Sequence, residues 1–255
     1  MRLGIFGDSF ADTNGDSELK TWPNLLAKKS EFAYIKARCG VSHYWTYKKF
    51  TEAVAHDNFT HIVFCHTSPY RWPCLPVELE GSNWNIHSLK NMSLTNDLEL
   101  LNKYYLDLFP DDFTKFISTS IFQNVNEYCR KNNIFLVNIV CFENLCENKS
   151  QFPLLTDLSP VSFYEHITYK NKRYSYEEFM KKHHLDHGDP RQCHMGYLNN
   201  KRLADIITNL FDSKQSNVQY NLAKEFEWHT DDISNDALFA KTWEDQLEAY
   251  NNNRL

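Results

Sequence analysis

The stretch Leu3-Gly4-Ile5-Phe6-Gly7-Asp8-Ser9-Phe10 decides the fold. A short apolar run ends in a glycine, and polar residues follow at once. Apolar runs bounded by turn signals are typical of strands that are buried on both faces. The stretch therefore predicts a first strand over residues 3–6 and a turn directly after it. In that turn, Ser9 lies just beyond the carboxyl end of the strand.

Comparable apolar runs cover residues 61–65 and 134–142, and a weaker one covers residues 33–37. Apolar residues at three-to-four spacing predict helices between and after the strands. These helices cover residues 22–29, 42–55, 94–109, 111–132, 176–184 and 196–211. Pro23 suits a first helical turn and Ser42 suits an N-cap. The alternation predicts a three-layer α/β/α sandwich with a mainly parallel sheet of about five strands, a flavodoxin-like arrangement.

The chain has 255 residues, of which 42% are hydrophobic, and a net charge of −6. This composition excludes a wholly disordered chain and disfavours a nucleic-acid partner, which requires clustered Lys and Arg. We expect one α/β domain over residues 1–214 and a C-terminal arm over residues 215–255. The 25 asparagines are typical of an AT-rich coding genome, such as a viral one.

No apolar run approaches the ~18 residues of a membrane span, and the N-terminal run is too short for a signal peptide. The seven cysteines are odd in number and form no CxxC pair, which indicates reduced thiols rather than a disulfide framework. We therefore expect a cytoplasmic protein with no membrane partner. The chain also lacks GxGxxG and Walker motifs, so we expect no nucleotide cofactor. The oligomeric state stays open.

Two segments carry residues suited to nucleophilic catalysis. Ser9 lies where open α/β folds bind ligands, at the carboxyl ends of the strands. His194 directly precedes the helix predicted over residues 196–211, and a serine nucleophile requires such a base. Asp189 could orient the imidazole. Each residue taken alone also fits an ordinary turn or helix-capping role.

Taken together, Gly7-Asp8-Ser9-Phe10 and the late His194 segment resemble the SGNH hydrolase superfamily, also called the GDSL esterase/lipase-like family. The resemblance spans roughly residues 1–214. It implies an esterase that needs no cofactor and acts on a small-molecule or carbohydrate ester, with removal of O-acetyl groups as one subclass. It further implies Ser9 as nucleophile, His194 as base and Asp189 as the acid of the catalytic triad.

The acid departs from the family pattern. The family places it three residues before the histidine, where this chain has Arg191. Asp189 lies five residues before His194, and Asp186 is the next candidate. A Ser-His dyad steadied by a backbone carbonyl is also open.

The oxyanion hole departs from the pattern as well. The resemblance implies the Ser9 and Gly40 amides as two donors and an Asn side chain after the third strand as the third. Residues 65–69 contain no Asn, so the hydroxyl of Thr67, or that of Ser68, is the candidate substitute.

The segment of residues 69–93 has the length of a binding loop or lid. Its notable aromatic residues are Tyr70, Trp72 and Trp84. Trp72 could stack on a sugar ring or cover an acyl chain. Arg71 could bind an anionic group of a substrate, and Asp8 is a further candidate for substrate binding.

Two other functions remain open. Residues 183–194 gather potential zinc ligands, which would suit a metal-assisted hydrolase. These ligands are His183, His184, His187, Asp189, Cys193 and His194. The region lacks HExxH and paired CxxC motifs, so we expect no metal site there. The missing Asn and the displaced acid also suit a non-catalytic binding or structural protein on the same fold.

Overall fold

The computed structural model describes residues 1–13, 20–69, 71–73, 83–84, 111–141, 150–156, 158, 166–169, 172–175, 197–222 and 230–232. Among these residues, no helix is long and apolar enough to cross a membrane. The cysteines described here are free thiols, namely Cys39, Cys65, Cys129 and Cys141.

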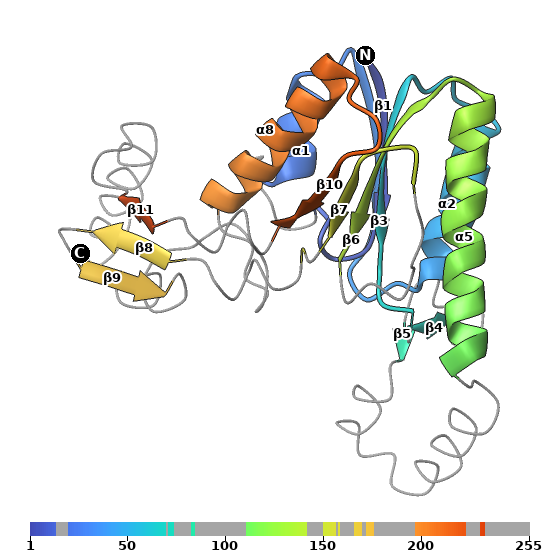
Figure 1. Ribbon diagram of the computed structural model, residues 1–255, viewed down its shortest axis with the longest axis horizontal. Coiled ribbons are helices and arrows are strands. Elements are labelled where there is room, and N and C mark those ends of the chain that lie inside the picture. The colour runs from blue at the N-terminus through green and yellow to red at the C-terminus, as the bar shows by residue number, and fades with distance from the viewer. Residues whose placement is uncertain are drawn as a thin grey trace, which may run out of the picture.

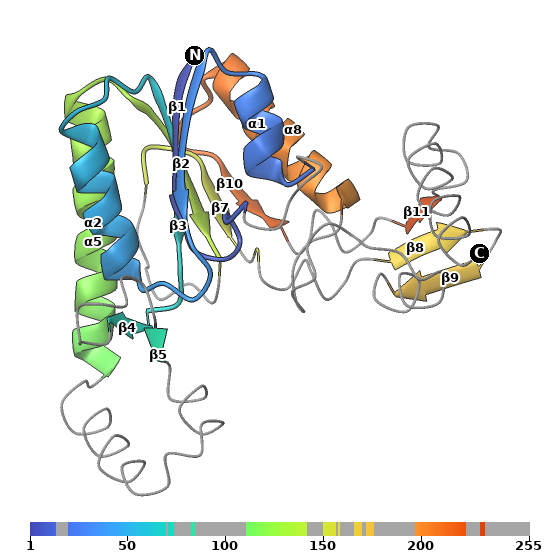
Figure 2. The ribbon, with the colours of Figure 1, turned by 180° about the vertical axis from the view of Figure 1, so that it is seen from behind.

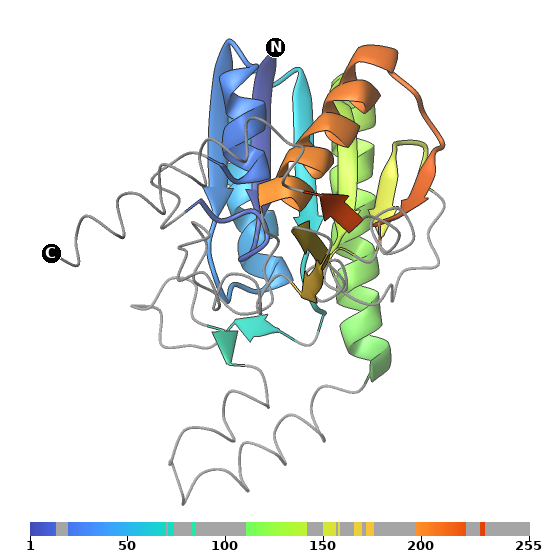
Figure 3. The same ribbon diagram turned by 90° about the vertical axis from the view of Figure 1, so that its left-hand side faces the viewer.

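The main sheet has six strands in the order β10-β7-β6-β3-β1-β2, and every neighbouring pair is parallel. The strands are β1 (Arg2–Gly7), β2 (Phe32–Ala37), β3 (His61–His66), β6 (Phe135–Val140), β7 (Leu154–Thr156) and β10 (Gln219–Asn221). The predicted parallel α/β fold is confirmed, with one strand more than the expected five. After α8 the chain returns to the sheet at β10, at the edge opposite β2 (Figure 3).

Two smaller sheets accompany the main one. The first pairs β4 (Trp72–Pro73) with β5 (Asn83–Trp84). The second joins β8 (His166–Tyr169), β9 (Lys172–Ser175) and β11 (Thr230–Asp232). The division into residues 1–214 and 215–255 stays a prediction, although β10 lies within the second part.

Helices cover both faces of the main sheet (Figures 1 and 2). One layer contains α1 (Trp22–Lys28) and α8 (Tyr197–Ser213), and the other contains α2 (His43–Val54) and α5 (Asp111–Lys131). Pro23 lies in the first turn of α1, and the Ser42 side chain caps α2 by accepting a hydrogen bond from Trp45 N at 3.1 Å. Both predicted helix starts are thus confirmed.

Each face of the sheet has its own apolar core. Leu3 and Ile5 of β1 pack in the core beneath α1 and α8, whereas Phe6 packs in the core beneath α2 and α5. On β3, Val63 faces the first core and Phe64 the second. Alternate side chains of a strand point to opposite faces, so covering both faces requires the continuous apolar runs seen in the sequence.

Gly7 is required by lack of space at the end of β1. A Cβ atom built on Gly7 would lie 2.7 Å from Cys65 Cβ and 2.8 Å from Ala11 Cβ. Both neighbours are Cβ atoms fixed by the backbone, so neither can rotate away. The glycine therefore permits the close approach of the turn after β1 to strand β3.

We expect Gly7→Ala to destabilise the protein by roughly 1–3 kcal/mol, the usual cost of overpacking. Urea unfolding of the wild type and the variant measures this cost. Gly4→Ala is the matched control, because the atoms nearest to an added Cβ there are side-chain ring atoms of Phe6 and Phe59, at 2.9 and 3.3 Å, and not backbone-fixed Cβ atoms. A Gly7→Ala variant no less stable than Gly4→Ala would contradict the packing argument.

Candidate functional site

The turns after β1, β2 and β3 meet at one edge of the sheet, the lower edge in Figure 1. The sheet order reverses next to β1, because β2 pairs on one side of it and β3 on the other. In open α/β folds, ligands bind outside the carboxyl ends of the strands at such a switch point. Ser9 follows β1, Gly40 follows β2 and Thr67 follows β3.

The Asp8 carboxylate is the central group of this edge, and it is fully buried. Its Oδ1 accepts a hydrogen bond from Phe10 N at 3.1 Å. Its Oδ2 accepts hydrogen bonds from Thr67 Oγ1 at 2.5 Å and from Arg71 Nη1 at 2.9 Å. Arg71 Nη1 also donates to Thr67 Oγ1 at 3.0 Å. The carboxylate therefore joins the turn after β1 to the loop after β3.

These contacts bear on three predicted roles. The Thr67 hydroxyl gives its proton to Asp8, so in this structure it is not directed at a substrate oxygen. Asp8 uses both carboxylate oxygens on protein donors. Arg71 places Nη1 on Asp8, and its side chain is 16% exposed. Contacts of Asp8 and Arg71 with a substrate stay predictions.

Further hydrogen bonds hold the turn that carries Ser9. Asp12 Oδ2 accepts from Cys39 N at 2.8 Å, which ties the turn to the loop after β2. Trp22 Nε1 donates to Phe10 O at 2.7 Å, which ties it to α1. Trp22 N in turn donates to Asn200 Oδ1 at 2.8 Å, in the first turn of α8. The Ser9 turn is thus anchored to β3, to the β2–α2 loop and, through α1, to α8.

The surroundings of Ser9 and the backbone of Gly40 bear on the roles predicted for them. Ser9 is 5% exposed, and within the described part of the chain its hydroxyl makes no hydrogen bond. Gly40 has a φ of +77°, a conformation in which a side chain is strained. The positive φ explains why the turn after β2 contains a glycine at this position.

Several predicted site residues lie outside the described residues. These are His194, Asp189 and Asp186, together with the rest of the His-rich segment of residues 183–194. Trp72 belongs to β4, and its side chain is not described. No group of three His, Cys, Asp or Glu side chains suited to a metal ion occurs among the described residues.

The structure adds a buried pair of histidines that the sequence analysis missed. His43 Nε2 lies 2.9 Å from His66 Nδ1, and both side chains are almost fully buried. Burial lowers the pKa of His66 to about 4 and lowers that of His43 well below its usual value. Both imidazoles are therefore neutral at neutral pH. The signal that could have revealed them is a histidine at the end of an apolar strand, which requires a buried partner.

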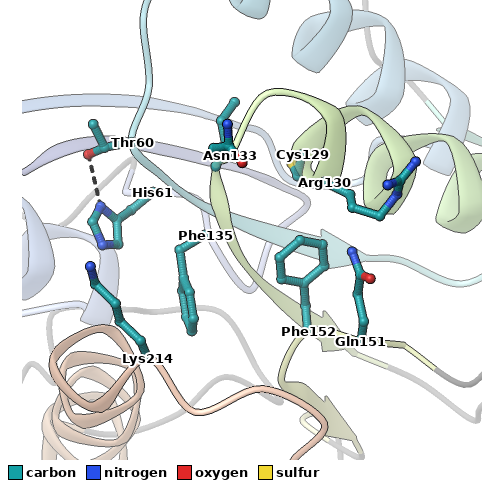
Figure 4. Close-up of a pocket in the computed structure, with 10 residues that line it drawn as sticks. Thr60, His61, Cys129, Arg130, Asn133, Phe135, Gln151, Phe152 and Lys214 are labelled. Carbon is teal, nitrogen blue, oxygen red and sulfur yellow. Dashed lines mark hydrogen bonds between the residues drawn. The ribbon is translucent and has the colours of Figure 1, made fainter.

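Two hollows lie at opposite ends of the sheet. A hollow of about 20 Å³, with room for roughly one water molecule, is lined by His43, Tyr44, Pro69, Arg71, Thr114, Ile117 and Ser118. It places His43 beside Arg71. A larger hollow, of about 370 Å³, lies at the amino ends of β3, β6 and β7, where His61, Phe135 and Lys214 line it (Figure 4). This second hollow is at the end of the sheet opposite Ser9.

No protein-family model matches the chain, and no curated protein matches it. Among solved structures, it is similar to a protein assigned to a lipolytic G-D-S-L family from Desulfitobacterium hafniense DCB-2, at 12% identity and a TM-score of 0.32. That similarity covers 54% of this chain and 58% of the other, so less than two thirds of that protein's length is spanned.

Two esterases are similar over more of the chain. The first is the psychrotrophic esterase EstA from Pseudoalteromonas sp., at 10% identity and a TM-score of 0.42, covering 84% of this chain and 97% of that one. The second is the acetyl xylan esterase AlAXEase, at 14% identity and a TM-score of 0.36, covering 96% and 98%. Similarity at these identities assigns no role to any residue.

We expect Asp8→Asn to destabilise the protein by roughly 3 kcal/mol, because it breaks an ion pair whose carboxylate is fully buried. Urea unfolding measures the loss. Asp205→Asn is the matched control, since Asp205 pairs with Lys29 and Lys201 but is 47% exposed, where an ion pair contributes little. Equal stabilities of the two variants would contradict the role given to Asp8.

We expect acid to destabilise the fold through His66. Between the unfolded pKa, about 6.5, and the folded pKa, about 4, the unfolded chain binds a proton that the native state does not. Stability therefore falls as the pH drops through this window. The free energy of unfolding should decrease by on the order of 2 kcal/mol between pH 7 and pH 5 from His66 alone.

Urea unfolding at both pH values tests this, with His66→Gln as the comparison. The variant should lose less stability on acidification than the wild type, because its amide does not titrate. An identical loss in the two proteins would show that His66 does not contribute.

Proposed function

We propose that the chain hydrolyses a carboxylic ester with Ser9 as the nucleophile. The observation that carries this proposal is the position of Ser9, directly after β1, the second strand from one edge of the sheet, at the point where the strand order reverses. The turn is held by neighbouring elements, and the Ser9 hydroxyl has no hydrogen-bond partner within the described part of the chain. A nucleophile requires a fixed position and a hydroxyl that a base can reach.

His194 is the proposed base and Asp189 the proposed orienting acid. Support comes from two hydrogen bonds of Trp22. Its backbone amide donates to Asn200 in the first turn of α8, and its indole donates to the carbonyl of Phe10, the residue after Ser9. His194 precedes Asn200 by only six residues. The tether therefore keeps the start of α8 within reach of the Ser9 turn, which is what a base from this segment requires.

In the proposed reaction, Ser9 Oγ attacks the ester carbonyl while His194 takes its proton. The carbon–oxygen bond to the alcohol breaks, and His194 returns the proton to the leaving oxygen. Water then hydrolyses the acyl-enzyme by the same route. The Ser9 and Gly40 amides stabilise the oxyanion. Thr67 can join them only if its bond to Asp8 opens.

The proposed substrate is a small-molecule or carbohydrate ester, with O-acetyl groups on a sugar as the subclass. This part of the proposal rests on the sequence resemblance together with Trp72 and Arg71 in the segment after β3. Trp72 would contact a sugar ring, and Arg71 would contact an anionic substituent.

A non-catalytic protein on the same fold is the second candidate. The observation that favours it is that the Thr67 hydroxyl donates to Asp8. The oxyanion would then have only the two backbone amides as donors, whereas the family pattern adds an Asn side chain as the third. Loss of one donor typically lowers turnover by ~10²–10³. A metal-assisted hydrolase using residues 183–194 is a third function, and elemental analysis for bound metal separates it from the serine mechanism.

We expect the purified protein to hydrolyse p-nitrophenyl acetate and butyrate. Ser9→Ala and His194→Ala should each lower the turnover by at least ~10³-fold, because nucleophile and base act as a unit. Ser213→Ala is the control. Its hydroxyl is exposed at the end of α8, where it bonds only to Asn209 O among the described residues, and its loss should leave turnover unchanged.

A fluorophosphonate reagent adds a test that is independent of the choice of ester. Mass spectrometry should locate the adduct on Ser9 in the wild type and find none in Ser9→Ala. Full activity in Ser9→Ala would sink the serine mechanism. A wild type that is neither labelled nor active, on model esters and on acetylated sugars, would favour the non-catalytic protein.

A further inference from the structure

A chain of hydrogen bonds runs through the interior from α5 to β6. Ser118 Oγ lies 3.2 Å from His43 Nδ1, His43 Nε2 lies 2.9 Å from His66 Nδ1, and His66 Nε2 lies 3.0 Å from Asn138 Oδ1. All four residues are at most 5% exposed. The two imidazole rings are nearly perpendicular, at 87°. This series of hydrogen bonds joins α5, α2, β3 and β6.

Asn138 determines which atom donates and which accepts in each of these hydrogen bonds. Its Nδ2 donates to Asn126 Oδ1 and Ser150 Oγ, both at 3.3 Å, so its Oδ1 is the atom that faces His66. An amide oxygen only accepts, so His66 Nε2 carries the proton and Nδ1 accepts. His43 must then donate from Nε2 and accept at Nδ1 from the Ser118 hydroxyl. Every donor and acceptor along the chain is satisfied with both histidines neutral.

The same hydrogen bonds also join two segments that the proposed function uses. His43 opens α2, three residues after Gly40 and directly after the cap residue Ser42. His66 ends β3, directly before Thr67. The hydrogen bond between the two rings therefore ties the turn that contains Gly40, after β2, to the end of β3. Strand β1 lies between these two strands in the sheet.

We propose that His43 and His66 are positioning residues that hold the Gly40 amide in place for the oxyanion, an inference that rests on the ester hydrolysis proposed above. An oxyanion donor acts only when it is preorganised, and a displacement of about 1 Å costs roughly 10²-fold in rate. The backbone at Gly40 has a positive φ, and no atom of the described residues lies within 4 Å of the position a Cβ would take. On one side of Gly40 the Cys39 N–Asp12 Oδ2 hydrogen bond restrains the turn, and the buried anchor at His43 restrains it on the other side.

Kinetics of His43→Phe test the proposal. The phenyl ring is a flat ring slightly larger than the imidazole, and it removes both hydrogen bonds. We expect kcat to fall roughly 10–100-fold while KM changes less than about twofold, because the Gly40 amide contacts the oxyanion and not the ground state. His43→Gln, which keeps a donor toward His66, should recover part of the loss. His61→Phe, at the opposite end of β3, is the matched control and should leave kcat unchanged.

Nuclear magnetic resonance supplies readouts that do not depend on turnover. Long-range 15N–1H spectra at neutral pH should show His43 and His66 as neutral rings protonated at Nε2. Backbone 15N relaxation should show Gly40 as rigid in the wild type, with an order parameter near 0.85, and well below that in His43→Phe.

The outcomes separate the two proposals. An unchanged Gly40 order parameter in His43→Phe, or an Nδ1-protonated tautomer at either ring, would overturn the positioning role. A wild type without esterase activity, but with Gly40 loosened in His43→Phe, would remove the ester hydrolysis and retain the structural restraint. Equal falls in kcat for His43→Phe and His61→Phe would indicate a general loss of structure and would also overturn the positioning role.

Discussion

The buried carboxylate of Asp8 is the constraint on which the arrangement of the site depends. A carboxylate without exposure is stable only when donors surround it. Here the donors are the amide of Phe10, the hydroxyl of Thr67 and the guanidinium of Arg71. They come from two separate loops, so the loop after β3 cannot shift without uncovering the charge. The position of the Ser9 turn is consequently set by an ionic contact as well as by the packing of Gly7 against β3.

The elements whose signals are local could be predicted from the sequence. The apolar runs of β1 and β3 and the N-cap Ser42 each depend on neighbouring residues, and the structure confirms them. Strands β7 and β10 contain three residues each, too few to show a periodic pattern, which is why the sequence predicts about five strands where the structure has six. The sequence shows only that the first apolar run ends in Gly7, whereas its neighbours Cys65 and Ala11 show that glycine is required there for lack of space.

The location of Ser9 could be predicted as well, because it requires only that a serine follow the first strand. The partners of the polar groups could not, since they lie far away in sequence. Thr67 is 59 residues from Asp8, and His66 is 72 residues from Asn138. A usable signal was nevertheless present. Asn138 interrupts an apolar run that is covered on both faces, and a polar residue in such a place must find a buried partner.

The end of β3 is held by two networks of different character. Successive side chains of a strand alternate, so His66 shares the face of Phe64, beneath α2 and α5, whereas Thr67 follows the end of the strand and bonds to Asp8. The His66 side is fixed by neutral rings and the Thr67 side by an ion pair. Desolvation keeps the imidazoles uncharged, so the ion pair between Asp8 and Arg71 is the charged part of this edge among the contacts described above. An edge held in this way needs little rearrangement when charge develops beside it, which is the property that electrostatic catalysis requires.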